Sequence, residues 1–162
     1  MGRRRGRSAA RSRSQAEPRL GPPELPLVAT RTRAPARILV VDGHEDVREL
    51  LVVVLRGEDR VVDAAGNGTE ALRWLERGRY DLVVSDLKMP ELDGPGLYRA
   101  VLRRWPNDPP FLFVSGFADT PDYAGFLNRA RVPLLCKPCD ADHLNASVRR
   151  MLEEHEAHPC RG

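Results

Sequence analysis

Four polar residues hold the groups that could do chemistry in this chain, and each of them follows a short apolar run. The groups are two carboxylates, a hydroxyl and an ammonium, on Asp42, Asp86, Ser115 and Lys137. Such a set suits phosphoryl transfer, because a carboxylate oxygen can attack phosphorus while an ammonium and a hydroxyl bind the other phosphoryl oxygens. Carboxylates can also hold Mg²⁺, which neutralises those oxygens. Four such residues in this order favour one shared site over four unrelated loop residues.

The segment around Asp86 indicates how such a residue would be positioned. Residues 82–84 form a short apolar run rich in β-branched side chains, which is typical of a buried strand. Pro90 cannot continue that strand, and Asp93-Gly94 is a turn signal ahead of a helical pattern. We therefore expect Asp86 at the carboxyl end of a central parallel strand, facing the crevice where such sheets bind ligands. Taken alone, this segment fits a loop-capping aspartate equally well.

Five strand patterns alternate with five helical patterns along the chain. We expect strands over residues 37–42, 60–64, 82–86, 111–115 and 132–136, and helices within residues 47–57, 67–78, 96–104, 119–129 and 140–154. This alternation predicts an α/β fold, in which a five-stranded parallel sheet carries helices on both faces. The strand order 2-1-3-4-5 is usual for five such units, and it brings the four polar strand ends to one edge of the sheet.

Charge and composition divide the chain into three segments. Residues 1–36 are rich in Arg, Ser, Pro and Gly without an apolar period, so we expect a disordered Arg/Pro-rich tail. Residues 37–155 are expected to form the domain, and residues 156–162 a C-terminal tail. The whole chain has a net charge of +3, and residues 1–37 carry ten Arg against two Glu, so the remainder is −5. A basic tail can touch nucleic acid or lipid, but no recognition helix or stacking platform accompanies it, so no specific nucleic-acid partner is expected.

The sequence also bears on where the protein works. Its apolar runs stay well short of the roughly 20 residues that cross a bilayer, so we expect no membrane span. The Arg-rich start lacks the apolar core of a secretory signal. Three cysteines, an odd number, argue against a disulfide framework and favour a cytoplasmic protein. We expect Cys136 to be a small buried residue rather than half of a redox pair with Cys139.

The order and spacing of these motifs resemble the receiver domain of two-component response regulators. The resemblance covers about residues 36–155 and is carried by the apolar runs that end in Asp42 and Asp86, by Lys88-Met89-Pro90 with Asp93-Gly94, by Val114-Ser115-Gly116 and by Lys137-Pro138. It implies a flavodoxin-like fold. It also implies that Asp86 is the phosphoacceptor and that its phosphoryl group comes from a phosphohistidine of a histidine kinase or a histidine phosphotransfer protein.

The resemblance implies roles for the residues around Asp86 as well. Lys137 would bind the phosphoryl group, and its bond to Pro138 would be cis, as in the family. Ser115 would be the switching hydroxyl, and the small Gly116 would leave the phosphoryl group accessible. A Mg²⁺ site is implied for Asp42, Asp86 and the backbone carbonyl of Lys88.

Two departures from the family pattern bear on these roles. The family usually has two adjacent acids after the first strand, of which the second binds the metal directly, whereas this chain has Asp42-Gly43. We expect weaker Mg²⁺ binding as a result, because the imidazole of His44 is a poor Mg²⁺ ligand and Glu45 is placed to start a helix. Many stand-alone regulators carry an aromatic residue where this chain has Leu134, so the chain looks more like receivers attached to hybrid histidine kinases.

Two functional hypotheses follow. The first is a phosphoacceptor receiver in a His-to-Asp phosphorelay, with no output domain, which is either a single-domain regulator or a piece of a hybrid kinase. Such a domain is not an enzyme in the usual sense, although it would catalyse its own phosphotransfer. The alternative is a pseudo-receiver, a protein-binding module that works without phosphorylation. Gly43 favours the alternative, whereas Asp86 and Lys137 argue against it.

Overall fold

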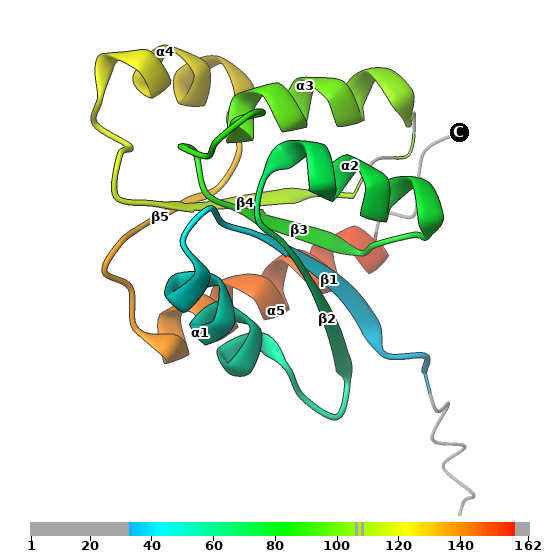
Figure 1. Ribbon diagram of the computed structural model, residues 1–162. Helices are drawn as coiled ribbons and strands as arrows, with labels where there is room; N and C mark the ends of the chain where they lie inside the picture. The colour runs from blue at the N-terminus through cyan, green and yellow to red at the C-terminus, as the bar shows by residue number, and fades with distance from the viewer. Residues whose placement is uncertain (1–32, 106, 108, 158–162) are drawn as a thin grey trace, which may run out of the picture. The chain divides into compact units, whose positions relative to one another are not determined.

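The computed structural model describes residues 33–157 except 106 and 108, and strands and helices alternate strictly along them (Figure 1). The strands are β1 (Ala36–Val41), β2 (Arg60–Ala65), β3 (Leu82–Ser85), β4 (Phe111–Ser115) and β5 (Leu134–Cys136). The helices are α1 (Glu45–Leu55), α2 (Gly68–Arg77), α3 (Gly94–Arg104), α4 (Pro121–Ala130) and α5 (Ala141–Ala157). Most of both expected tails lies outside the described residues.

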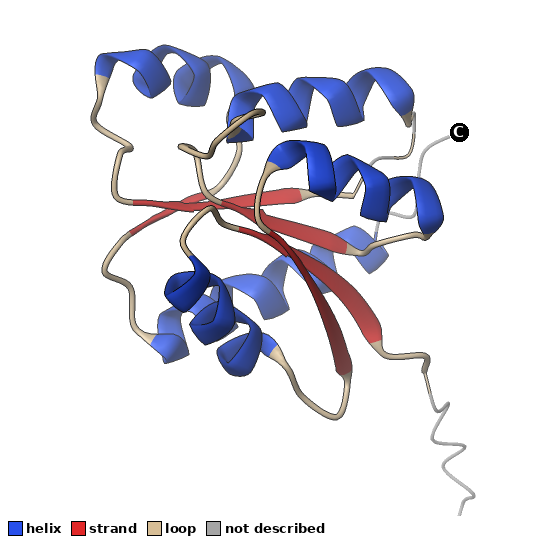
Figure 2. Cartoon of the chain, in the orientation of Figure 1, coloured by secondary structure: helices blue, strands red, loops and turns tan. Residues whose placement is uncertain are grey.

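The five strands form one parallel sheet in the order β2-β1-β3-β4-β5, which confirms the predicted fold class and order. Helices α2, α3 and α4 cover one face of the sheet, and α1 and α5 cover the other (Figure 2). Alternate residues of β1 serve the two faces: Ile38 and Val40 pack with α1 and α5, and Leu39 and Val41 pack with α2 and α3. Because both faces are covered, the central strands are continuous apolar runs.

Some element boundaries differ from those expected, and local capping explains two of them. Helix α3 begins at Gly94, because the Asp93 carboxylate accepts a hydrogen bond from the Gly96 N–H and so caps the helix. Helix α4 begins at Pro121, which occupies the first turn after Thr120. Strand β5 starts two residues later than expected, and α5 ends three residues later.

The expectation that Cys136 is buried is wrong. Strand β5 lies at an edge of the sheet, and along it Leu135 is buried while Cys136 is exposed. Successive side chains of a strand point to opposite faces, so an apolar composition did not decide which residue pointed outward.

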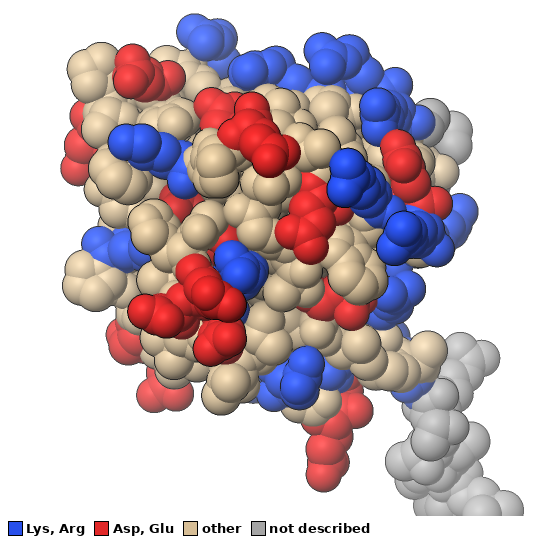
Figure 3. Space-filling model, viewed as in Figure 1, with Lys and Arg blue, Asp and Glu red and all other residues tan. Residues whose placement is uncertain are grey.

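The described surface is uneven in charge. Acidic side chains gather over α1, and arginines gather along α2 and α3 (Figure 3). The first turn of α1 carries Glu45 and Asp46, and the last turn of α3 carries Arg103 and Arg104. The acidic end of α1 directly follows β1, so it adds to the negative potential at the carboxyl edge of the sheet. Among the described residues, helices are too short or too polar to cross a membrane.

Candidate functional site

The carboxyl edge of the sheet brings together all four predicted strand-end residues, which we call the acidic pocket: Asp42, Asp86, Ser115 and Lys137. Strands β1 and β3 pair at their last residues, so Asp42 and Asp86 leave neighbouring strands at the same level. Strands β4 and β5 also pair at their last residues, Ser115 and Cys136. Lys137 directly follows Cys136 and therefore lies next to Ser115 at this edge. Asp42, Asp86 and Ser115 are buried, and Lys137 is 23% exposed. Parallel pairing alone accounts for this convergence of residues that are far apart in the chain.

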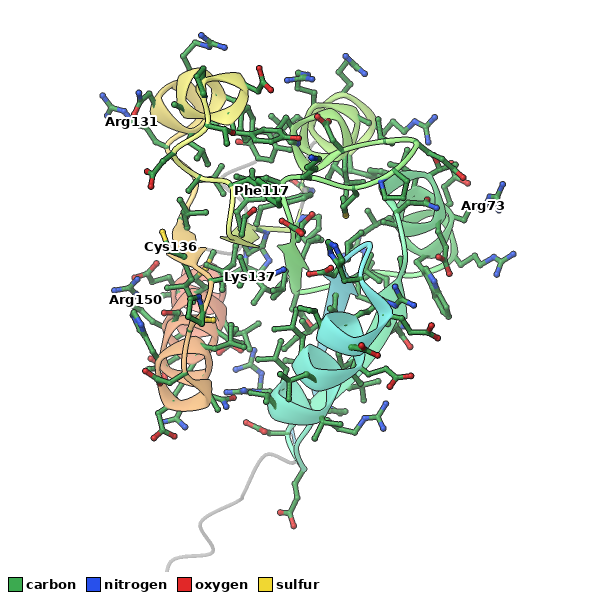
Figure 4. All side chains as sticks on the ribbon, turned by 60° about the vertical axis from the view of Figure 1, so that its left-hand side comes forward. Arg73, Phe117, Arg131, Cys136, Lys137 and Arg150 are labelled. Carbon is green, nitrogen blue, oxygen red and sulfur yellow. The ribbon has the colours of Figure 1, made fainter. Side chains whose placement is uncertain are left out.

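Lys137 reaches from the end of β5 towards the two carboxylates (Figure 4). Its Nζ lies 2.6 Å from Oδ2 of Asp42 and 3.4 Å from Oδ2 of Asp86. The Lys137–Pro138 peptide bond is cis, as expected. Two buried carboxylates share one ammonium, and their oxygens keep lone pairs that could bind a cation.

The other pocket groups keep hydrogen-bonding capacity for a ligand. Oδ1 of Asp86 accepts a hydrogen bond of 2.7 Å from the Leu87 N–H. The Ser115 hydroxyl oxygen accepts one of 3.2 Å from the Phe117 N–H, so its own hydrogen can still be donated. A Cβ added at Gly116 would meet no heavy atom within 4 Å apart from those of its chain neighbours, so the space on the side-chain side of Gly116 is open.

The Asp93-Gly94 turn closes the loop that follows Asp86. The Gly94 N–H donates a hydrogen bond of 2.9 Å to the Leu87 carbonyl. A Cβ at Gly94 would collide with the carbonyl oxygen of Asp86 and with the ring of Phe113. Only glycine allows the loop to return this closely to the end of β3, so the turn signal in the sequence is also what holds Asp86 in place.

The β1 side of the pocket includes two residues that the sequence did not place there, His44 and Arg48. The His44 N–H donates a 2.9 Å hydrogen bond to Oδ1 of Asp42, and its ring Nδ1 lies 3.4 Å from the same oxygen. Arg48 donates a 2.8 Å hydrogen bond to the Asp42 carbonyl. The spacing of Asp42 and His44 is that of an Asx-turn, a local signal that could have brought His44 into the pocket. Glu45 starts α1, as expected.

A divalent cation fits the side chains of this pocket. One ligand atom each from Asp42, His44 and Asp86 lies within 4.8 Å of the others. Carboxylate oxygens are the ligands that Mg²⁺ prefers, and receiver domains typically bind Mg²⁺ at an acidic pocket. A Cβ at Gly43 would lie 3.0 Å from Cδ of Pro90, so room for a side chain at that position is limited.

An open groove runs beside the pocket. It is lined by Gly43, His44, Lys88, Met89, Pro90 and Phe117. The Lys88 Nζ lies 4.9 Å from the centroid of the Phe117 ring, and Phe117 is 38% exposed. The groove therefore gives solvent and small ligands access to the side of the pocket where Gly43 and His44 lie.

A five-stranded parallel sheet in this order, with polar residues gathered at its carboxyl edge, defines a flavodoxin-like fold. The family model for the response regulator receiver domain matches residues 38–149. The chain belongs to the response regulator receiver domain family, whose members serve two-component systems as signalling modules rather than as classical enzymes.

Relatives of this chain include receivers within larger proteins. The sensor kinase CckA of Brucella abortus is 37% identical over 130 residues, which cover 79% of this chain and 14% of the kinase. The transcriptional regulatory protein GlrR of Escherichia coli K12 is 33% identical over 120 residues, which cover 74% of this chain and 27% of that protein. The chain thus spans only a small part of each of these relatives.

Solved receiver structures match the fold closely. The receiver domain of an HD domain-containing protein from Pseudomonas fluorescens has a TM-score of 0.69 and 28% identity, and the match covers 77% of this chain and 99% of that one. The receiver domain of a histidine kinase from Syntrophus aciditrophicus has a TM-score of 0.66 and 30% identity, with coverage of 74% and 91%. Both similarities extend across nearly the whole of the solved receiver domains.

Proposed function

We propose that this chain is a phosphoacceptor receiver in a His-to-Asp phosphorelay and that Asp86 accepts the phosphoryl group. The observation that carries the proposal is the shared ammonium of Lys137, 3.4 Å from the buried carboxylate of Asp86 and 2.6 Å from that of Asp42. A positive charge in this position can hold a phosphoryl group on Asp86 without leaving the pocket.

The chemistry assigned to the pocket is a direct transfer between two side chains. An oxygen of the Asp86 carboxylate attacks the phosphorus of a phosphohistidine, so a P–O bond forms while the P–N bond breaks and the electron pair returns to the donor imidazole. Lys137 and the Ser115 hydroxyl then bind oxygens of the transferred group. When bound, Mg²⁺ supplies further neutralisation of those oxygens, and its ligands would be Asp42, Asp86 and the backbone carbonyl of Lys88.

The phosphoryl donor and the bounds of the receiver are also part of the proposed function. The donor is a histidine kinase or a histidine phosphotransfer protein in the cytoplasm, and the similarity to the receiver part of a sensor kinase supports this. The receiver covers residues 37–155, as expected from the sequence, and the elements at its two ends extend it to Ala36 in β1 and Ala157 in α5. Gly43 offers no third carboxylate, so Mg²⁺ binds more weakly than in receivers with two adjacent acids.

Acetyl phosphate tests the acceptor. With Mg²⁺ present, the protein should gain one phosphoryl group that is stable in acid and is removed by hydroxylamine, as measured by intact mass. Asp86→Ala should gain none, whereas Asp142→Asn, which changes an exposed acid on α5, should match the parent. Retention of the group in Asp86→Ala would show that another residue is the acceptor.

The second candidate function is that of a pseudo-receiver, a protein-binding module that works unphosphorylated. Two observations favour it: the missing acid at Gly43, and the shorter distance from Lys137 to Asp42 than to Asp86. A pseudo-receiver should fail to take phosphate from any donor, and its binding of a partner kinase, measured by calorimetry, should be the same in the parent and in Asp86→Ala.

A further inference from the structure

His44 lies at the acidic pocket without a helix-capping role. It is the N-cap residue of α1, a position that favours Ser, Thr, Asp or Asn because their side chains bond to the helix backbone. The imidazole of His44 makes no such bond. Its side chain is 67% exposed, and its Nδ1 lies 3.4 Å from Oδ1 of Asp42. The ring thus contacts the pocket at Asp42 and makes no helix-capping bond that binding a ligand would have to break.

The orientation of Asp42 leaves a place for that ligand. Its Oδ2 faces Lys137, whereas its Oδ1 faces the backbone and the ring of His44. Each carboxylate oxygen has two lone pairs, so Oδ1 can accept the His44 N–H and still bind a cation. A cation on the His44 side of Asp42 would thus not displace the ammonium of Lys137.

The distances suit an ion between Asp42, His44 and Asp86. Ligands at about 2.1 Å from a metal ion lie about 3.0 Å from their neighbours and about 4.2 Å from the ligand opposite. The three ligand atoms here lie within 4.8 Å of one another. Movements of less than about 1 Å would bring them to bonding distance, and the exposed side chain of His44 can make such a movement.

We propose that His44 takes the part of the acid missing at Gly43 as a metal ligand, so that this pocket prefers a divalent first-row transition-metal ion such as Mn²⁺ over Mg²⁺. Imidazole nitrogen suits these ions and is a poor ligand for Mg²⁺, whereas carboxylates bind both. Asp42 and Asp86 then supply most of the affinity, and His44 supplies the selectivity. The inference rests on the metal role given to these two carboxylates in the proposed function, but not on phosphorylation.

Metal titration of the full chain without an affinity tag tests this proposal. Mn²⁺ and Mg²⁺ are titrated separately by calorimetry into the parent, His44→Ala and the matched control His143→Ala, which removes an exposed imidazole from α5. His44→Ala should weaken Mn²⁺ binding about tenfold or more, at least as much as loss of an outer-shell partner does. Mg²⁺ binding should be nearly unchanged, and His143→Ala should match the parent for both ions.

Pulsed electron paramagnetic resonance gives a second readout. Bound Mn²⁺ should show coupling to a ¹⁴N nucleus in the parent and in His143→Ala, and not in His44→Ala. His44→Asn, which keeps a good N-cap residue but lacks the imidazole, should also lose the coupling, and its thermal melting without metal checks that the fold is retained.

Several results would overturn the assignment of His44. One is that His44→Ala loses equal affinity for Mn²⁺ and Mg²⁺, or loses affinity for neither. Another is that Mn²⁺ bound to the parent shows no coupling to nitrogen. The last is that the parent binds neither ion. Labelling with acetyl phosphate separates this proposal from the proposed function. If Asp86 is not phosphorylated while Mn²⁺ binding depends on His44, the phosphorelay role fails and the metal assignment stands. If Asp86 is phosphorylated while Mn²⁺ binding does not depend on His44, only the metal assignment fails.

Discussion

Each of the two edges of the sheet has a polar cluster, and both clusters contain carboxylate, cationic and hydroxyl side chains. Near the amino ends of β1 and β3 lies the amino-edge cluster of Arg37, Asp63 and Tyr80. Arg37 and the Tyr80 hydroxyl donate hydrogen bonds of 2.9 and 2.8 Å to the same Asp63 oxygen, and the Arg37 guanidinium lies 4.7 Å from the centroid of the Tyr80 ring. The Asp63 carboxylate there meets one cation and one hydroxyl, whereas in the acidic pocket at the other end the Asp42 and Asp86 carboxylates share the Lys137 ammonium.

This difference separates a structural cluster from a site that can take a ligand. In the amino-edge cluster the Arg37 guanidinium is paired with Asp63, and burial together with the hydrogen bond to Asp63 raises the pKa of Tyr80. In the acidic pocket the Asp42 and Asp86 carboxylates share the Lys137 ammonium, the Ser115 hydrogen can still be donated, and an open groove lies alongside. A polar cluster at a strand end therefore indicates a ligand site when its groups keep free hydrogen-bonding capacity and a groove reaches it. Asp63 in β2 links β1, through Arg37, with the segment before β3, through Tyr80.

The largest effect is expected from removing the one ammonium of the pocket. Lys137→Met leaves Asp42 and Asp86 as unpaired neighbouring carboxylates, which should lower the free energy of unfolding by about 2–3 kcal/mol, less than for a fully buried pair because Lys137 is partly exposed. Urea denaturation measures this change, and phosphorylation by acetyl phosphate should be lost. Adding Asp86→Ala to Lys137→Met should restore part of the stability. An unchanged urea midpoint in Lys137→Met would mean that the ammonium of Lys137 does not stabilise the two carboxylates in the folded protein.

Restoring the missing acid should bring a smaller change at the same edge. Gly43→Asp adds a third carboxylate and should tighten Mg²⁺ binding by about 1–2 kcal/mol, the lower part of the range for a charge-assisted ligand. The new Cβ would lie 3.0 Å from Cδ of Pro90, so the loop must shift slightly and part of the gain is lost. Calorimetric Mg²⁺ titration measures the difference, with Gly43→Asn as an uncharged control of the same shape. Equal affinities for parent and Gly43→Asp would indicate that another group already fills the place.

The amino-edge cluster should respond in stability alone. Tyr80→Phe removes the hydrogen bond to Asp63 and should lower the free energy of unfolding by about 1 kcal/mol, with unchanged phosphorylation. The raised pKa of Tyr80 adds a pH dependence: above the ordinary tyrosine pKa of about 10, the unfolded state ionises first, so the stability due to this group falls as pH rises. Urea denaturation at rising pH should show a shallower loss in Tyr80→Phe. A drop in phosphorylation would instead couple the two edges of the sheet.

The smallest effect is expected from removing residues 1–32, which lack apolar periodicity and so have little apolar surface to bury on folding. A chain that starts at Arg33 retains β1, which begins at Ala36, and should melt cooperatively within a few degrees of the full chain. Calorimetric melting of both chains provides the test. Any binding of DNA should disappear with the segment and weaken steeply with salt, whereas salt-resistant binding by the shortened chain would contradict its assignment to the tail.

The sequence by itself determined the order of the elements and the identity of the strand-end residues. Apolar runs and the breaks after them are local features, so Asp42, Asp86, Ser115 and Lys137 could be found without knowing any contact. Because parallel strands share one carboxyl edge, the convergence of these four residues followed from the predicted topology. The Asp93-Gly94 turn was found for the same reason, since turn chemistry is encoded within a few residues.

Only the tertiary structure decided how the polar groups share their partners. Lys137 could pair with Asp42 or Asp86, and side-chain geometry across 95 residues of sequence separation places it nearer to Asp42. The ring of His44 could face solvent or the pocket, and the turn after β1 places it 3.4 Å from Asp42. Cys136 could point inward or outward, and its register beside β4 turned it to solvent. These choices depend on distances of a few ångströms between separate elements, which residue types and spacing do not specify.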